Sequence, residues 1–303
     1  MKVVETPRWF TEAIGHQPEH HTVESGGATI TYRVWGRPDA PLVVLVHGGA
    51  AHAGWWDHVG PHLAADHRVA ALDLSGHGDS SWRDAYGLTT FAAEVMAVAD
   101  AESVRRPAIV GHSMGGFVAL TAAREYGARL AGVCAIDSPV RQPSPEARAW
   151  QAENRRLPGN KIYPTRDDAL ARFRTIPADD AGPPYVRRHI AATSVREVEG
   201  GWTWKFDPQV FFSARMEPEE IAAATCPVAL VRGERGLATS DITATVAERL
   251  GGAAPVTVIP DAGHHVMIDQ PVALIAAMQT LLGQWQLLRR LAAVPEDEPP
   301  RGV

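Results

Sequence analysis

Ile109-Val110-Gly111-His112-Ser113-Met114-Gly115-Gly116 joins a short apolar run to a stretch of helix-forming residues. A sharp turn from a strand into a helix forces strained backbone angles on the residue at its centre. It also brings the chain on either side so close together that only glycine fits two positions before and two positions after that residue. Gly111 and Gly115 stand at these two positions. The turn would raise the Ser113 hydroxyl at a helix N-terminus, where the peptide dipoles favour developing negative charge. We therefore interpret Ser113 as a nucleophile, with a plain strand-to-helix connection as the alternative.

Short apolar runs recur on both sides of this turn, as expected for strands that are covered on both faces. Helical patterns at residues 91–102 and 117–126 separate them. This alternation predicts an α/β fold with right-handed crossovers and a mainly parallel sheet flanked by helices. Two alternating stretches around Gly26-Gly27 predict a hairpin that adds an antiparallel edge and brings the sheet to eight strands. The other six predicted strands are Leu42–Val46, Val69–Leu72, Ala108–Val110, Gly132–Ile136, Val228–Val231 and Val256–Ile259.

The strand–helix rhythm breaks after residue 138, in a stretch rich in Arg, Pro and aromatic residues. A connection of roughly eighty residues is too long for a simple loop. We expect a helical lid at residues 139–222, inserted into a core domain formed by residues 1–138 and 223–303. Its aromatic side chains could line an apolar pocket or pack into the lid's own core. Arg155-Arg156, Arg187-Arg188 and several single arginines could favour a carboxylate-bearing substrate, but a solvated, salt-bridged surface explains them better.

The composition is that of a soluble globular protein, with 45% hydrophobic and 21% charged residues among 303. A formal charge of −6 gives no pull toward nucleic acid or anionic membranes, and no apolar run reaches the length of a membrane span. Cys134 and Cys226 lie in or beside apolar runs, which suits small buried side chains. The first residues lack a signal-peptide pattern, so we expect a cytoplasmic protein. A homodimer is an alternative to a monomer.

Four motifs in a fixed order resemble the α/β-hydrolase family in its serine-nucleophile, esterase- or lactonase-like branch. They are Val46-His47-Gly48-Gly49, residues 73–80, the Ser113 turn and Gly263-His264. The resemblance implies an α/β-hydrolase fold with a catalytic triad and no required cofactor. The epoxide hydrolase and haloalkane dehalogenase branches share this fold but use aspartate as the nucleophile, so Ser113 argues against them.

The resemblance also implies the general base and the oxyanion hole. His264 follows the last predicted strand and matches the family's Gly-His position, although the adjacent His265 is an alternative. The backbone N–H groups of Gly49 and Met114 would stabilise the oxyanion, with Ala50 as the alternative to Gly49. The thirteen histidines show no metal-ligand spacing, so we expect no metal.

The acid of the triad is missing from its usual place. In much of the family it follows the seventh strand, but no carboxylate stands near Gly236 where it is expected. Some members place the acid one strand after the nucleophile, where this chain has Asp137 at the end of a predicted strand. We therefore expect Asp137 to orient the histidine, with Glu234 as the second choice. We expect Asp241 to cap a helix instead.

Together these residues predict a serine hydrolase that cleaves a carboxylic ester or lactone with an apolar portion through an acyl-enzyme intermediate. A C–C bond hydrolase of a ring-cleavage product would use the same three residues. An acyltransferase and a slow-turnover small-molecule receptor on the same fold are further alternatives.

Overall fold

An eight-stranded sheet forms the centre of the computed structural model, which describes residues 5–103, 106–153, 157–178, 182–212 and 215–292. The strand order is β1-β2-β4-β3-β5-β6-β9-β10. β2 pairs antiparallel with β1 and β4, and all other neighbours are parallel. The strands are β1 (Glu19–Ser25), β2 (Ala28–Trp35), β3 (Leu42–Val46), β4 (Arg68–Leu72), β5 (Ala108–His112), β6 (Gly132–Ile136), β9 (Val228–Gly233) and β10 (Val256–Ile259).

The predicted α/β fold with a mainly parallel sheet is confirmed. β3, β6 and β10 match their predicted ranges, and the hairpin β1–β2 adds the expected antiparallel edge. β5 and β9 each run two residues further than the apolar pattern indicated. The last residues of these strands, His112 and Gly233, have no branched apolar side chain. They still pair in the sheet, His112 with Ile136 and Gly233 with Ile259.

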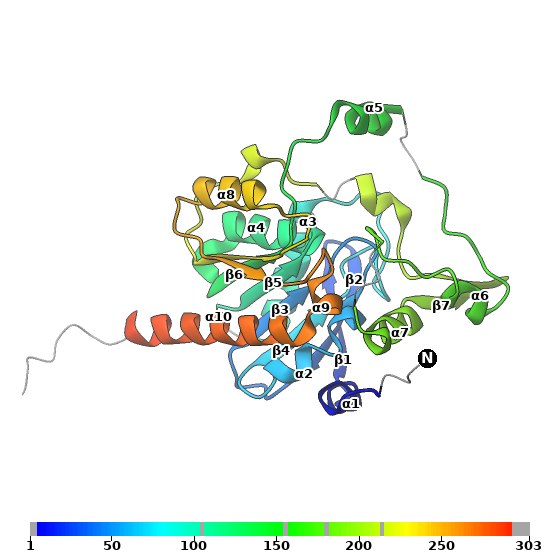
Figure 1. Cartoon of the computed structure of the whole chain (residues 1–303), viewed down its shortest axis with the longest axis horizontal. Coiled ribbons are helices and arrows are strands. Elements are labelled where there is room, and N and C mark those ends of the chain that lie inside the picture. Colours follow the sequence, from blue (N-terminus) through cyan, green and yellow to red (C-terminus); the bar gives the residue numbers. More distant parts are fainter. Residues whose placement is uncertain (1–4, 104–105, 154–156, 179–181, 213–214, 293–303) are drawn as a thin grey trace, which may run out of the picture.

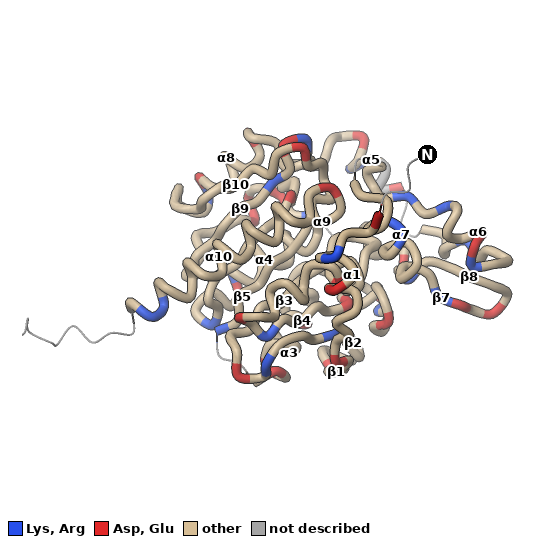
Figure 2. Tube along the Cα trace, turned by 60° about the horizontal axis from the view of Figure 1, so that its bottom comes forward, with Lys and Arg blue, Asp and Glu red and all other residues tan. Residues whose placement is uncertain are grey.

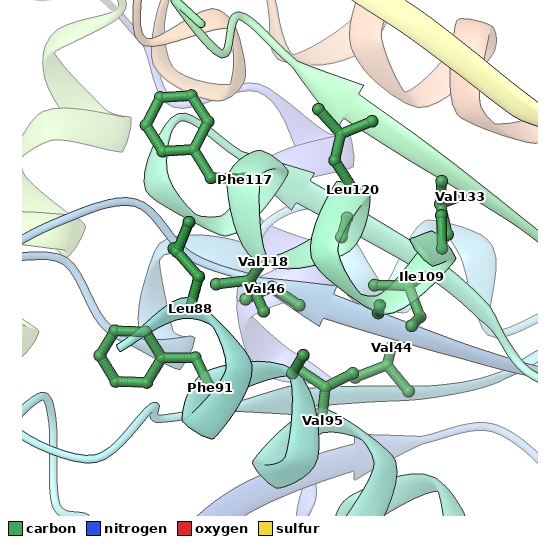
Figure 3. Packing of buried hydrophobic residues seen from close by; sticks show 14 of the residues in the cluster. Val44, Val46, Leu88, Phe91, Val95, Ile109, Phe117, Val118, Leu120 and Val133 are labelled. Atoms are coloured by element: carbon green, nitrogen blue, oxygen red, sulfur yellow. The ribbon is translucent and has the colours of Figure 1, made fainter. Parts of the chain in front are cut away.

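Helices cover both faces of the sheet (Figure 1). Val44 and Val46 point to the face that is covered by α3, α4 and α8, whereas Val43 and Leu45 point to the other. Figure 3 shows the first of these two cores, where Phe91 and Val118 pack over the strands. The helices around the sheet are α1 (Arg8–Gly15), α2 (Gly60–Leu63), α3 (Leu88–Ala101), α4 (Met114–Tyr126), α8 (Ser240–Arg249), α9 (Val266–Asp269) and α10 (Pro271–Ala292), with the 3-10 helices η1 (Ala53–Trp56) and η2 (Gly127–Arg129).

The chain leaves the sheet between β6 and β9, and we call residues 139–222 the insert. It contains a two-stranded antiparallel hairpin besides helices, which the sequence did not predict. The hairpin strands are mostly half-exposed and therefore lack the buried apolar run of the central strands. The elements of the insert are α5 (Pro145–Glu153), α6 (Arg166–Leu170), α7 (Pro184–Thr193), β7 (Val195–Val198), β8 (Gly201–Trp204), η3 (Pro208–Phe212) and η4 (Pro218–Glu220).

Polar contacts hold the insert against the core. His189 on α7 lies 2.9 Å from a carboxylate oxygen of Asp57, and the Lys205 ammonium lies 2.8 Å from that of Asp79. The N–H group of Gly78 donates a hydrogen bond of 2.7 Å to the backbone carbonyl of Lys205. The division into a core and a lid stays a prediction, but these contacts fix where the insert sits over the sheet.

Acidic and basic residues are interspersed along the trace in Figure 2. Within the described ranges, no helix combines the length and the apolar character that crossing a membrane requires. Both cysteine side chains are buried, and burial raises the pKa of the Cys134 thiol to about 12.

Candidate active site

The Ser113 turn has the tight geometry that its glycines predicted. Ser113 has φ 54° and ψ −116°, between the end of β5 and the first residue of α4. A Cβ atom on Gly111 would lie 1.9 Å from the carbonyl oxygen of Gly115, and one on Gly115 would lie 2.4 Å from that of Val46. Neither position therefore accepts a side chain. The Ser113 N–H donates a 2.8 Å hydrogen bond to Ile136, which ties the strained turn to β6.

The structure brings Ser113, His264 and Asp137 into one hydrogen-bonded chain. The Nδ1 atom of His264 lies 2.6 Å from Oδ2 of Asp137, and its Nε2 atom lies 3.0 Å from Oγ of Ser113. Because an ionised carboxylate only accepts hydrogen bonds, the proton of the neutral imidazole is on Nδ1. The Nε2 lone pair then faces the Ser113 hydroxyl and can accept its proton.

Asp137 follows β6 directly and is completely buried. Its carboxylate accepts hydrogen bonds from the N–H groups of Gly233, at 3.2 Å, and Leu237, at 2.8 Å, in addition to His264. A buried carboxylate is costly unless such donors replace its hydration. The backbone N–H groups of Gly233 and Leu237, at and after the end of β9, therefore stabilise the negative charge of Asp137, which follows β6.

The other carboxylates that were considered for this role lie elsewhere. Glu234 is exposed, and its carboxylate accepts a 3.0 Å hydrogen bond from the N–H of Asp261. Asp241 lies in the first turn of α8, but Thr239 is the N-cap residue, so the expectation that Asp241 caps the helix is wrong by two positions. Asp73 is buried and accepts hydrogen bonds from the N–H groups of Ala53 and Asp79, which fixes two loops.

Two further histidines surround His264. The Nε2–H group of His112 donates a 2.8 Å hydrogen bond to the carbonyl oxygen of His264, and burial lowers the pKa of His112 well below its ordinary value. A neutral His112 thus holds the loop that carries His264. The His265 ring packs at 5.5 Å against the edge of Trp55 and lines the cavity described below. His264 and not His265 makes the hydrogen bonds to Ser113 and Asp137.

His112, His264 and His265 also form a group whose ligand-type atoms lie within 4.8 Å of one another. Their spacing in the sequence gave no sign of this group. Both ring nitrogens of His264 already have hydrogen-bond partners, as does Nε2 of His112. His264 could bind a metal ion only by giving up a hydrogen bond to Ser113 or Asp137.

The predicted oxyanion residues border the same cavity as Ser113. Gly49 and Met114 both line it, and so does Ala50, whose φ is 56°. His47 holds this turn, since its Nδ1–H donates to Gly48 at 2.7 Å while its Nε2 accepts from the N–H of Leu74. Burial lowers the pKa of His47 to about 4, so the ring is neutral at neutral pH and can make both bonds.

A cavity of about 400 Å³ lies between the core and the insert, with Ser113 in its wall. Aromatic side chains from both parts form much of the wall, and Tyr163, Tyr185 and Trp202 do not belong to it. Tyr185 packs on Phe10 of α1 instead. The aromatic residues of the wall are Trp55, Phe117, Phe173, Trp204, Phe206 and Phe211. The lid aromatics therefore divide between lining the cavity and packing elsewhere.

Seven lining residues were not named individually from the sequence, although single arginines were considered as a group: Thr175, Ile176, Ser194, Phe211, Arg172, Arg174 and Arg215. They come from η3 or from irregular segments of the insert, where no periodic pattern marks one face. Arg187 and Arg188, which were considered for a substrate carboxylate, do not line the cavity, and Arg155 and Arg156 lie outside the described residues.

Residues 43–278 match the Alpha/beta hydrolase family, and the chain therefore belongs to this family of hydrolase enzymes. It is 27% identical over 278 residues to Esterase Rv0045c of Mycobacterium tuberculosis, which covers 88% of this chain and 90% of that protein. Lipase LipV of the same organism is 25% identical over 253 residues, 81% of this chain and 95% of that protein. The thioesterase domain from the curacin biosynthetic pathway has a TM-score of 0.74 at 24% identity, over 88% of this chain and 99% of that domain. This last similarity is one of fold.

Proposed function

We propose that this chain is a serine hydrolase that cleaves a carboxylic ester or lactone, with Ser113 as nucleophile, His264 as base and Asp137 as the residue that orients His264. The observation that carries the proposal is the hydrogen-bonded chain from Ser113 through His264 to a buried Asp137. The similarity to an esterase and a lipase over most of the chain supports ester hydrolysis.

In the first half-reaction, His264 Nε2 takes the hydroxyl proton as Ser113 Oγ forms a bond to the carbonyl carbon. The electron pair of the carbonyl moves to its oxygen, and the N–H groups of Gly49 and Met114 stabilise the oxyanion. The ester C–O bond then breaks, and His264 returns the proton to the leaving alkoxide. An acyl-enzyme and a free alcohol result.

Water completes the reaction by the same path. His264 takes a proton from water as the water oxygen attacks the acyl carbon, and returns it to Ser113 Oγ when the acyl bond breaks. The sum is an ester and water converted to an acid and an alcohol. Asp137 keeps its negative charge and stabilises the imidazolium that forms in each step.

The aromatic wall of the cavity supports a small-molecule substrate with an apolar portion. The complete hydrogen-bonded chain favours turnover over a slow receptor, because a receptor needs no base aimed at a hydroxyl. C–C bond cleavage would use the same residues on a different substrate, so substrates must distinguish the two reactions.

The test is a panel of 4-nitrophenyl esters, lactones and ring-cleavage dienoates, offered to the wild-type chain and to Ser113→Ala. We expect release of 4-nitrophenol from the short esters by the wild type, and at least about a 10³-fold lower kcat in the variant. Unchanged ester hydrolysis in Ser113→Ala would contradict the proposal. Cleavage of the dienoate alone would replace ester hydrolysis by C–C hydrolysis.

A further inference from the structure

The cavity next to Ser113 carries positive charge at its rim. Arg172, Arg174 and Arg215 line it, and no Asp or Glu stands among its described lining residues. The chain as a whole has 35 acidic and 29 basic residues, so this local excess runs against the overall balance. All three arginines come from the insert, whereas Ser113 comes from the core.

The three guanidinium groups have no carboxylate partner among the described residues. Arg174 donates to the backbone carbonyl oxygens of Phe173, at 2.6 Å, and Ala171, at 3.4 Å. No ion pair involves Arg172 or Arg215 within the part of the chain that the structure describes. By contrast, Arg33 and Arg68 pair with acidic side chains within 3 Å.

We propose that the substrate is an ester whose far end carries an anionic oxygen-bearing group, a carboxylate or a phosphate, which Arg172, Arg174 and Arg215 bind while Ser113 attacks the ester. This inference rests on the proposed function and defines its substrate class. The guanidinium fork matches the geometry of both anions and forms charge-assisted hydrogen bonds with them. The aromatic wall between core and insert would hold the apolar chain that joins the two ends.

The position of the arginines at an exposed rim fits binding better than a purely structural role. All three residues are exposed, so they do not hold the insert together from within. Because they are exposed, their guanidinium groups stay partly hydrated when an anion binds, so binding avoids most of the desolvation cost of a buried ion pair. An exposed cluster also attracts a charged substrate at a distance, and salt weakens this attraction.

Three matched substrates test the inference: 4-nitrophenyl hexanoate, mono-4-nitrophenyl adipate and the 4-nitrophenyl ester of 5-phosphonopentanoic acid. Their acyl chains have equal length, and only the far end differs. We expect kcat/KM to be about tenfold higher for at least one anionic ester at low salt, and the preference to shrink as salt rises to about 1 M. The better anion identifies carboxylate or phosphate as the natural group. Equal or faster hydrolysis of the hexanoate ester would overturn the inference.

Substitution of the three arginines tests whether they cause the preference for anionic esters. The triple variant Arg172→Gln, Arg174→Gln, Arg215→Gln should hydrolyse the anionic esters with no higher kcat/KM than the hexanoate ester. Arg188→Gln is the control, because Arg188 is an exposed arginine of the insert that does not line the cavity. A preference that survives in the triple variant would contradict the assignment.

Binding to Ser113→Ala provides a readout that does not depend on catalysis. The methyl ester of adipate or of 5-phosphonopentanoate, whichever anion the kinetics favour, should bind this variant about tenfold more tightly than methyl hexanoate, measured by titration calorimetry. Equal affinities would overturn the anion site even if the protein hydrolyses esters. Conversely, a clear preference in a protein that hydrolyses no ester would refute the proposed function and leave the anion site standing.

Discussion

The carboxylate of Asp137 fills the space that a side chain at Gly236 would need. A Cβ atom on Gly236 would lie 1.9 Å from Oδ1 of Asp137. Asp137 follows β6, whereas Gly236 follows β9, the next strand of the sheet. Two neighbouring strand ends thus meet at one point beside His264. An acidic residue that follows β6 and a glycine after β9 are two parts of one arrangement.

Gly236→Ala tests this arrangement. The added methyl group must displace the Asp137 carboxylate, because the contact is far shorter than any real Cβ contact. We expect a loss of stability of about 1–3 kcal/mol and a fall in kcat of at least about tenfold. Thermal unfolding and ester hydrolysis measure the two effects. Gly159→Ala is the control, since a Cβ atom there meets nothing within 4 Å. Equal behaviour of the two variants would contradict the steric account.

Asp137→Asn tests which carboxylate orients His264. The amide would hold the imidazole in the wrong tautomer and would not stabilise the imidazolium, so kcat should fall by about 10³–10⁴. Glu234→Gln should leave kcat within about twofold of the wild type, because the Glu234 carboxylate accepts its hydrogen bond from the Asp261 backbone and not from His264. If Glu234→Gln removed activity and Asp137→Asn kept it, the acid would be wrongly assigned.

We expect different kinetic effects when His264 and the adjacent His265 are each replaced by alanine. His264→Ala removes the group that faces both Ser113 and Asp137, so ester hydrolysis should fall by at least about 10³-fold. His265→Ala removes a cavity wall residue that packs on Trp55, so we expect a change mainly in KM. Steady-state kinetics on both variants separate these effects. A large loss of kcat in His265→Ala alone would reverse the assignment.

Buried neutral histidines make the fold sensitive to acid. Burial lowers the pKa of His58 to about 4, while its Nε2–H donates a 2.7 Å hydrogen bond to Met267. Because the unfolded pKa is about 6.5, the unfolded chain binds more protons between these values. The free energy of unfolding should therefore fall as the pH drops from about 6.5 to about 4, and stay unaffected by His58 above that window.

His58→Gln measures this contribution, because glutamine can still donate to the Met267 carbonyl but carries no titrating proton. Urea unfolding at pH 7 and pH 5 should show that the variant loses about 2 kcal/mol less stability than the wild type between the two pH values. An identical pH dependence in both proteins would refute a buried, neutral His58.

The sheet and the Ser113 turn could be predicted because their signals are local. A run of branched apolar residues indicates a strand that is covered on both faces. Gly111 and Gly115 indicate a turn too tight for side chains at these two positions. The placement of Asp137 beside His264 followed from topology, since a residue at the end of β6 must lie next to the end of β5.

The insert could not be predicted at the same level. Most residues of β7 and β8 are only partly buried, and these strands therefore lack the apolar run of a central strand. Arg172, Arg174 and Phe211 reach the cavity through the tertiary placement of irregular segments, and no spacing along the chain encodes that placement. The contribution of these irregular insert segments to the cavity wall is thus visible only in the three-dimensional structure.

The most direct test of the central claim is covalent labelling of the folded protein with a fluorophosphonate, followed by mass spectrometry of its peptides. An activated serine attacks the phosphorus and displaces fluoride, whereas an ordinary surface serine does not. We predict one stoichiometric adduct on Ser113, lost in Ser113→Ala and strongly slowed in His264→Ala. No labelling of the intact protein, or an adduct on another residue, would contradict the assignment of Ser113 as nucleophile.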